Sequence, residues 1–259
     1  MNSKPHILVS NDDGIDAEGL YVLVKALKQF ASVSVVAPSI QQSAVGHAIT
    51  VRTPLRVHKF YRDGKPFGYA VDGTPADCVK LAIRTLLKAK PDLVISGIND
   101  GLNTAVNVIY SGTVSAATEG TILGIPSIAV SLESTRKPNF EPAAKIAMSI
   151  ARFVCKKRLP GDTVLNVNVP ALPVAKIKGI MFTRQGRSRW DDEFFQRKDP
   201  KNRDYYWLAG KMQILDSEGD VDQVALKHGY ISITPIHFDL THYDFLEKMR
   251  REWSLDIRR

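Results

Sequence analysis

Residues 6–14 read His-Ile-Leu-Val-Ser-Asn-Asp-Asp-Gly, an apolar run that ends in polar residues and a glycine. The apolar residues are continuous rather than alternating, which is typical of a strand buried on both faces in a parallel sheet. The stretch that follows, at 17–29, predicts an amphipathic helix. A strand, a polar loop and a helix make the first part of a βαβ unit, so we expect an α/β fold.

The same alternation continues through the first half of the chain. Further strands are predicted at 33–37, 92–96, 127–131 and 163–169, a hairpin at 50–72, and helices at 75–89, 113–123 and 141–157. Thr74 and Pro75 fit the N-cap and first turn of one helix. This order predicts a three-layer α/β fold with a mostly parallel, Rossmann-like sheet.

The pattern changes after about residue 184. Residues 186–215 are charged and aromatic and predict a protruding β-hairpin, followed by a strand at 229–234 and a C-terminal helix at 241–252. Aromatic residues outside a core are typical of a subunit interface, although a locally packed flap fits the pattern equally well. We therefore expect a catalytic core at 1–184 and an oligomerisation segment at 185–259.

Composition narrows the class of protein. Of 259 residues, 44% are apolar and 24% charged, which is ordinary for a globular chain. The two cysteines lie far apart, which is typical of a reducing compartment. The apolar run near the N-terminus is too short for a signal peptide, and no apolar stretch is long enough to span a membrane. We therefore expect a cytoplasmic protein with no membrane partner. The net charge of +8 mildly favours anionic ligands. Acidic residues dilute the basic cluster at 184–203, so stable nucleic-acid binding is not expected.

Ligands of open α/β sheets bind at the carboxyl ends of the strands, which selects the loop after Ser10. Asp12 and Asp13 are adjacent there, and each carboxylate would raise the pKa of the other. A divalent cation removes that penalty, and hard oxygen ligands suit Mg²⁺, Mn²⁺ or Ca²⁺. Considered alone, Asp-Asp-Gly is read more readily as a turn and helix cap.

Two other loops at the same predicted edge supply further polar groups. Ser43 follows the second strand and offers a hydroxyl, while Asn99 follows the strand at 92–96 and offers an amide oxygen. Residues 110–113 read Tyr-Ser-Gly-Thr before a helix, and helix N-termini bind phosphate. Metal ligands and an anion cradle at one sheet edge predict a phosphate-handling site.

Several other motifs are weaker. Cys78 and Arg84 have the Cys-x5-Arg spacing of cysteine phosphatases, but no glycine lies between them to wrap a phosphate. Neither a P-loop nor a Gly-x-Gly-x-x-Gly fingerprint is present. His47 fits a hydrogen-bonded loop histidine better than a general base.

Several ordered blocks resemble the SurE survival protein family of 5′-nucleotidases. The resemblance covers nearly the whole chain and rests on residues 7–14, 36–38, 72–79, 91–99, 110–117 with Glu119-Gly120, and 229–235. Each block is weak alone, but together and in this order they are specific.

The resemblance implies a role for each candidate residue. It implies one divalent cation per subunit, Mg²⁺ or Mn²⁺, with Asp12 and Asp13 as catalytic residues. The implied metal ligands are Asp12, Asp13, Ser43 and Asn99, and the implied phosphate- and substrate-binding residues are Asn11, Asn103, Ser111, Gly112 and Thr113. It further implies hydrolysis of nucleoside 5′-monophosphates, often also of 3′-monophosphates and short polyphosphate, by a homodimer or homotetramer.

One stretch departs from the family pattern. Residues 104–107 are Thr-Ala-Val-Asn, with Ala105 where the family has glycine, and an alanine is not expected to adopt a left-handed backbone there. A milder departure is Ala44 after Ser43. The altered loop keeps a second hypothesis open, a non-catalytic nucleotide or polyphosphate sensor. A third is a phosphatase acting on other phosphomonoesters or on a phosphoprotein.

Overall fold

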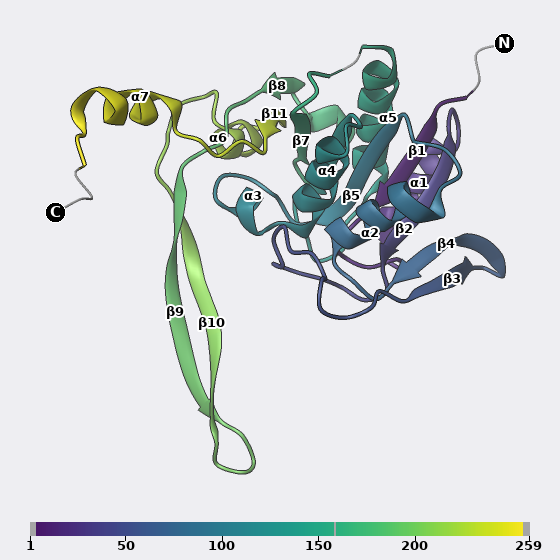
Figure 1. Cartoon of the computed structure of the whole chain (residues 1–259), viewed down its shortest axis with the longest axis horizontal. Coiled ribbons are helices and arrows are strands. Elements are labelled where there is room, and N and C mark those ends of the chain that lie inside the picture. Colours follow the sequence, from purple (N-terminus) through teal and green to yellow (C-terminus); the bar gives the residue numbers. More distant parts are fainter. Residues whose placement is uncertain (1–3, 158, 256–259) are drawn as a thin grey trace.

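The fold is built on a nine-stranded, mostly parallel sheet (Figure 1). The computed structural model describes residues 4–157 and 159–255. Within them the strand order is β3-β4-β2-β1-β5-β6-β7-β11-β8. The bounds are β1 His6–Ser10, β2 Ser32–Pro38, β3 Val57–Arg62, β4 Lys65–Val71, β5 Leu93–Asp100, β6 Ser127–Leu132, β7 Thr163–Val169, β8 Ile180–Phe182 and β11 Ile231–His237. The α/β class predicted from the sequence is confirmed.

Helices cover both faces of this sheet, which gives the three predicted layers. Ile7 and Val9 point into one core, with α1 (Glu18–Leu27) and α5 (Glu141–Lys156). Leu8 points into the other core, with α2 (Pro75–Leu81) and α4 (Gly112–Ile122). Alternate side chains of β1 are therefore buried on opposite faces, as the continuous apolar run predicted.

Helix α2 starts where the sequence indicated and ends earlier. Thr74 accepts a hydrogen bond from the backbone N–H of Asp77, and the Asp77 carboxylate accepts one from the N–H of Thr74, which makes a capping box. A π-helical turn at Ala82–Leu86 follows, and Leu87 is extended. The predicted end at residue 89 is therefore too late, because the chain has already turned toward β5.

The last third of the chain contains the predicted hairpin and C-terminal helix. Among the described strands, β9 (Ser188–Lys198) and β10 (Asp204–Ile214) pair with each other and with no other strand, and they project from the domain (Figure 1). Helix α7 (Tyr243–Glu252) buries none of its residues. Strand β11, in contrast, joins the main sheet between β7 and β8. The functional division at residue 184 stays a prediction.

Four short elements were not predicted: α3 (Asn107–Tyr110), a 3-10 turn (Val174–Lys176), β8, and α6 (Asp222–Lys227). Each is too short to show a hydrophobic period. Across residues 4–157 and 159–255, every helix is too short or too polar to span a bilayer.

Candidate functional site

The carboxyl ends of β1, β2 and β5 open into a cavity of about 890 Å³. Six of the nine candidate residues line it: Asp12, Asp13, Ser43, Asn99, Asn103 and Ser111. They come from loops far apart in the sequence, and the parallel sheet brings them together at one edge. The predicted clustering of these residues is thus present in the structure.

Asp12 lies against the N-terminus of α4. Thr113 donates its hydroxyl proton to the Asp12 carboxylate, and only 7% of Asp12 is exposed. Burial raises the pKa of Asp12, although hydrogen bonds from Thr113 and from backbone N–H groups oppose the rise. The first helix has Ala17 as its N-cap without a side-chain cap, so the two aspartates do not cap it.

Asp13 is a carboxyl group whose ionisation is disfavoured. Burial, together with the neighbouring Asp12 charge, raises the pKa of Asp13 to about 6. The backbone N–H of Asp100 donates to Asp13 at 3.4 Å and opposes the rise only weakly. Two close carboxylates with raised pKa values form a site that a dication would stabilise.

Asn99 and Ser43 present neutral oxygens to the same cavity. The Asn99 side-chain N–H donates to the Gly101 carbonyl at 2.7 Å, which leaves the amide oxygen available. The Ser43 hydroxyl accepts from the Gln41 amide at 2.9 Å on an exposed loop. Two carboxylates, an amide oxygen and a hydroxyl are a hard, all-oxygen donor set, which fits Mg²⁺ or Mn²⁺.

Acidic, histidine and cysteine side chains alone do not make this site. In the part of the chain that the structure describes, no three of them group together in a way that could hold a metal ion. A cation bound between Asp12 and Asp13 would therefore need the neutral oxygens of Asn99 and Ser43, or water, to complete its shell.

The predicted phosphate-binding residues fall into two groups. Asn103 and Ser111 line the cavity, and Ser111 also caps α4 by accepting from the N–H of Val114 at 3.1 Å. Thr113 is fully buried and holds Asp12 instead. A Cβ on Gly112 would lie 2.7 Å from the Asp12 Cβ, so glycine is needed for this close approach.

Asn11 does not line the cavity. Its side-chain N–H donates to the Gly14 carbonyl at 2.9 Å, and the residue is fully buried. Gly14 follows with φ of 98°, a left-handed conformation that favours glycine. Asn11 therefore shapes the turn that presents Asp12 and Asp13 to the cavity.

A buried amide network behind Asn103 was missed in the sequence. Asn168 accepts from the N–H of Asn103 at 2.8 Å, and both Asn166 and Asn168 donate to the Asn103 carbonyl. Asn103 in turn donates to the Ser131 hydroxyl at 2.9 Å. Asparagines at alternate positions of an otherwise apolar strand were the available signal, because buried amides need fixed partners.

The departure at residues 104–107 does not prevent the left-handed turn. Ala105 adopts φ of 48° and is fully buried, so the prediction that alanine would not take this conformation is wrong. Its N–H donates to the Asp222 carboxylate at 2.9 Å, and its carbonyl accepts from Gln185 at 2.8 Å. These two bonds offset the strain. Ala44 is likewise left-handed, with φ of 56°.

The hairpin supplies one wall of the cavity, which the sequence did not reveal. The residues concerned are Ser188, Arg189, Trp190, Asp192, Leu208, Ala209 and Gly210. Trp190 donates its indole N–H to the side-chain oxygen of Asn107 at 3.0 Å. The sequence placed the aromatic residues of 186–215 in a subunit interface or a flap, but one of them, Trp190, lines the cavity.

Two interpretations of single residues agree with the structure. His47 bonds Glu119 at 3.0 Å, and Lys80 bonds the same carboxylate at 2.6 Å. Burial acts to raise the pKa of Glu119, but His47 and Lys80 outweigh it and lower the pKa overall. Cys78 is fully buried, and burial raises its thiol pKa, the opposite of what a nucleophilic cysteine needs.

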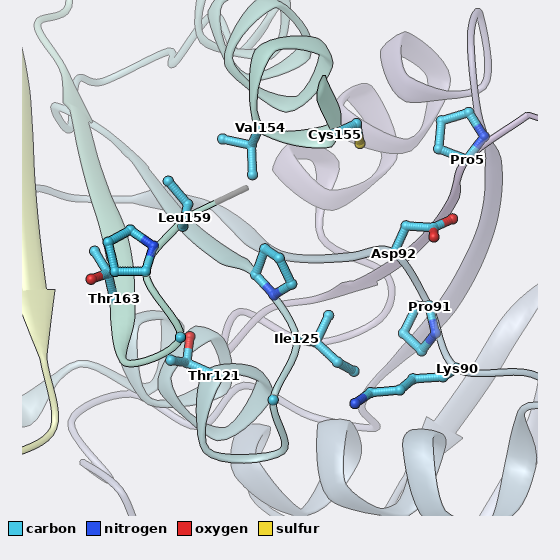
Figure 2. Close-up of a pocket in the computed structure, with 14 residues that line it drawn as sticks. Pro5, Lys90, Pro91, Asp92, Thr121, Ile125, Val154, Cys155, Leu159 and Thr163 are labelled. Carbon is cyan, nitrogen blue, oxygen red and sulfur yellow. The ribbon is translucent and has the colours of Figure 1, made fainter. Parts of the chain in front are cut away.

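A second cavity of about 560 Å³ lies at the opposite edge of the sheet, among the loops that precede the strands (Figure 2). Its lining includes Pro5, Lys90, Pro91, Thr121 and Cys155. None of the candidate residues lies there.

Comparison with known proteins identifies the family. A family model described as Survival protein SurE matches residues 7–192. "5′-nucleotidase SurE" of Chlorobaculum tepidum is 47% identical over 97% of this chain and 95% of its own length. The protein of the same name from Syntrophus aciditrophicus is 52% identical, over 94% and 92%. The crystal structure of the SurE protein from Aquifex aeolicus superposes with a TM-score of 0.82 at 44% identity, covering 95% of this chain and 99% of that one. The chain belongs to the SurE family.

Proposed function

We propose that this protein is a divalent-cation-dependent phosphomonoesterase that hydrolyses nucleoside 5′-monophosphates to nucleoside and phosphate. The observation that carries the proposal is the convergence of the buried Asp12 carboxylate and the half-buried Asp13 carboxylate with Asn99, Ser43, Asn103 and Ser111 on one cavity. Relatives that cover nearly the whole chain are named 5′-nucleotidase, which supports the reaction and the substrate class.

The residues have separable roles in this proposal. Asp12, Asp13, Ser43 and Asn99 would hold one Mg²⁺ or Mn²⁺, and this cation would neutralise phosphoryl charge and lower the pKa of a bound water molecule. Thr113 fixes the orientation of Asp12 through its hydroxyl. Asn103 and Ser111 border the space next to these ligands, where a phosphoryl group can be held.

The test is phosphate release from AMP with Mn²⁺, with Mg²⁺ and with excess chelator, by the wild type and by Asp13→Asn. We expect activity with a cation, none with chelator, and a loss of at least about 100-fold in the variant. Asp92→Asn, the same chemical change at the opposite edge of the sheet, should stay within about twofold of the wild type. Activity that survives chelation or Asp13→Asn would overturn the proposal.

The same assay separates the finer alternatives. Nucleotide binding without turnover under every cation would favour the sensor. The main reason for the sensor was the altered 104–107 loop, and that reason is weakened because Ala105 takes the left-handed turn. Rates on 3′-monophosphates, short polyphosphate and phosphomonoesters without a base would define the substrate range, which we propose to include 3′-monophosphates and short polyphosphate.

We also propose that the segment after residue 184 makes a homodimer or homotetramer. The support is the exposure of large apolar side chains, with Trp207 on β10 65% exposed and Leu240 before α7 92% exposed. Light scattering of the whole chain and of a variant with a shortened β9–β10 hairpin tests this assembly. The cytoplasmic location stays a prediction.

A further inference from the structure

One face of the β9–β10 hairpin is turned to the cavity. Ser188, Trp190 and Asp192 alternate along β9, and Gly210 pairs with Asp192 across the ladder. With Leu208, these residues share one face by the two-residue period of a strand, and all five line the cavity. Arg189 and Ala209 reach the cavity from positions between them.

The Trp190 ring is fixed and partly open. Its indole N–H donates to the Asn107 side chain at 3.0 Å, and 41% of the residue is exposed. Asn107 begins the short helix α3, which leads to Tyr110, another exposed aromatic on the cavity wall. A ring held by its polar edge with part of its surface uncovered is suited to stacking.

The base of the hairpin is tied to the same loop. Asp222 accepts from the N–H of Ala105 at 2.9 Å and from the N–H of Gly186 at 3.1 Å. A Cβ on Gly186 would lie 2.8 Å from the Asp222 carboxylate, so the contact requires glycine. The start of β9 and the 104–110 loop are therefore held at one buried group, and Trp190 has a defined place relative to Ser111.

We propose that Trp190 and the hairpin face around it bind the nucleobase of the substrate, with Trp190 as a specificity-determining residue. The inference rests on the proposed function, because the phosphate must lie at the Asp12–Asp13 end of the same cavity. A cavity of about 890 Å³ can hold a whole mononucleotide. Aromatic stacking is tolerant of the base, so the wall selects nucleotides over phosphomonoesters that lack one.

The experiment compares Trp190→Ala with Trp207→Ala, the same truncation on the opposite face of the hairpin, where Trp207 pairs with Phe195. Each variant is assayed on AMP and on ribose 5-phosphate, which lacks the base. Trp190→Ala should raise KM for AMP about 10- to 100-fold and change kcat/KM for ribose 5-phosphate less than about twofold. Trp207→Ala should leave the ratio between the substrates unchanged.

Equal loss on both substrates, or no loss on AMP, in Trp190→Ala would overturn the inference. Calorimetric measurement of adenosine binding tests the role of Trp190 without hydrolysis. Trp190→Ala should weaken the affinity for adenosine, and unchanged affinity would also overturn the inference. A wild type that binds adenosine through Trp190 but releases no phosphate would refute the proposed function alone.

Discussion

The two edges of the central sheet each carry a cavity, and the candidate residues line only one of the two. At the carboxyl edge, the lining of a cavity of about 890 Å³ includes Asp12, Asp13 and Asn99. At the amino edge, a cavity of about 560 Å³ is lined by prolines and aliphatic residues together with polar ones, which are Lys90, Asp92, Thr121, Cys155 and Thr163. There the Asp92 carboxylate is already used by the N–H of His6, at 2.8 Å. The difference lies in the adjacent carboxylates of Asp12 and Asp13, which line the cavity at the carboxyl edge and have no counterpart in the lining of the other cavity.

Helix α4 connects the two edges and sharpens the contrast. Its first turn places Gly112 and Thr113 against Asp12, while Thr121, in its last turn, lines the opposite cavity. The Thr113 hydroxyl has a carboxylate partner, whereas the buried Thr121 hydroxyl has none among the described residues. Matched substitutions on this one helix can therefore test the comparison.

Among the substitutions around Asp12, the largest effect is expected for Gly112→Ala. The new Cβ would lie 2.7 Å from the Asp12 Cβ and 3.1 Å from the Pro75 ring, so Asp12 must shift. We expect phosphate release to fall about 100-fold, because a displacement of about 1 Å in a catalytic group has that cost and Asp12 is proposed to be one. Gly161→Ala is the control, because Gly161 lines the other cavity and no heavy atom of the described residues lies within 4 Å of the new Cβ. Similar losses in both variants would contradict the comparison.

Thr113→Val should reduce activity about 10- to 100-fold, because the hydroxyl that orients Asp12 is removed without loss of volume. Thr121→Val, at the other end of the same helix, should leave kcat/KM unchanged. It should keep or raise the unfolding midpoint, since it removes a buried hydroxyl that has no partner among the described residues. Steady-state kinetics and thermal unfolding of both variants provide the measurement. Equal activity in the two variants would contradict the role of Thr113 in orienting Asp12.

A smaller effect, about 10-fold in activity, is expected for Asp222→Asn, because the amide keeps one acceptor oxygen where the carboxylate uses both, one for the N–H of Ala105 and one for that of Gly186. If the main task of Asp222 is to keep Ala105 left-handed, adding Ala105→Gly should restore part of the loss, since glycine adopts that backbone freely. In a double-mutant cycle, the effects of the two substitutions on activity should then be non-additive. Additive effects would show that Asp222 acts independently of the turn.

The smallest effect concerns stability rather than turnover. Burial and the Asp12 charge raise the pKa of Asp13 to about 6, above its ordinary value of 3.8, so ionisation opposes folding. Below about pH 4 the group is protonated in both states, and stability should fall as pH rises from about 4 to 6. Unfolding midpoints in chelator should show this decline in the wild type more than in Asp13→Asn. Added Mn²⁺ should reverse it above pH 6, and identical pH profiles would count against this ionisation.

Much of the fold could be predicted because local signals were strong. The strand at His6–Ser10 and that at Thr163–Val169 were predicted at their observed bounds, since short segments rich in valine, isoleucine and leucine are typical of strands. The clustering of Asp12, Asp13 and Asn99 followed from the rule on strand ends. The hydrogen bond from Thr113 to Asp12 joins residues 101 positions apart, and no local sequence pattern predicts it.

The hairpin wall was hidden for the same reason. Sequence periodicity predicts that residues 186–215 form two strands, but not which face meets a loop more than 80 positions away. Ala105 was misjudged because its conformation is imposed by Asp222 and Gln185, from a segment expected to act only in assembly. Tertiary contacts there override the local preference of the residue.

The position of β11 bears on how the chain reaches its native state during synthesis. β8 ends at Phe182 and β11 begins at Ile231, yet the two lie side by side, and Thr183 is hydrogen-bonded to Ser232 and Thr234. Until residue 237 has left the ribosome, β7 has one open edge and can pair with a foreign strand. The nascent chain therefore has a window, about as long as the synthesis of the hairpin, in which it most needs protection from aggregation.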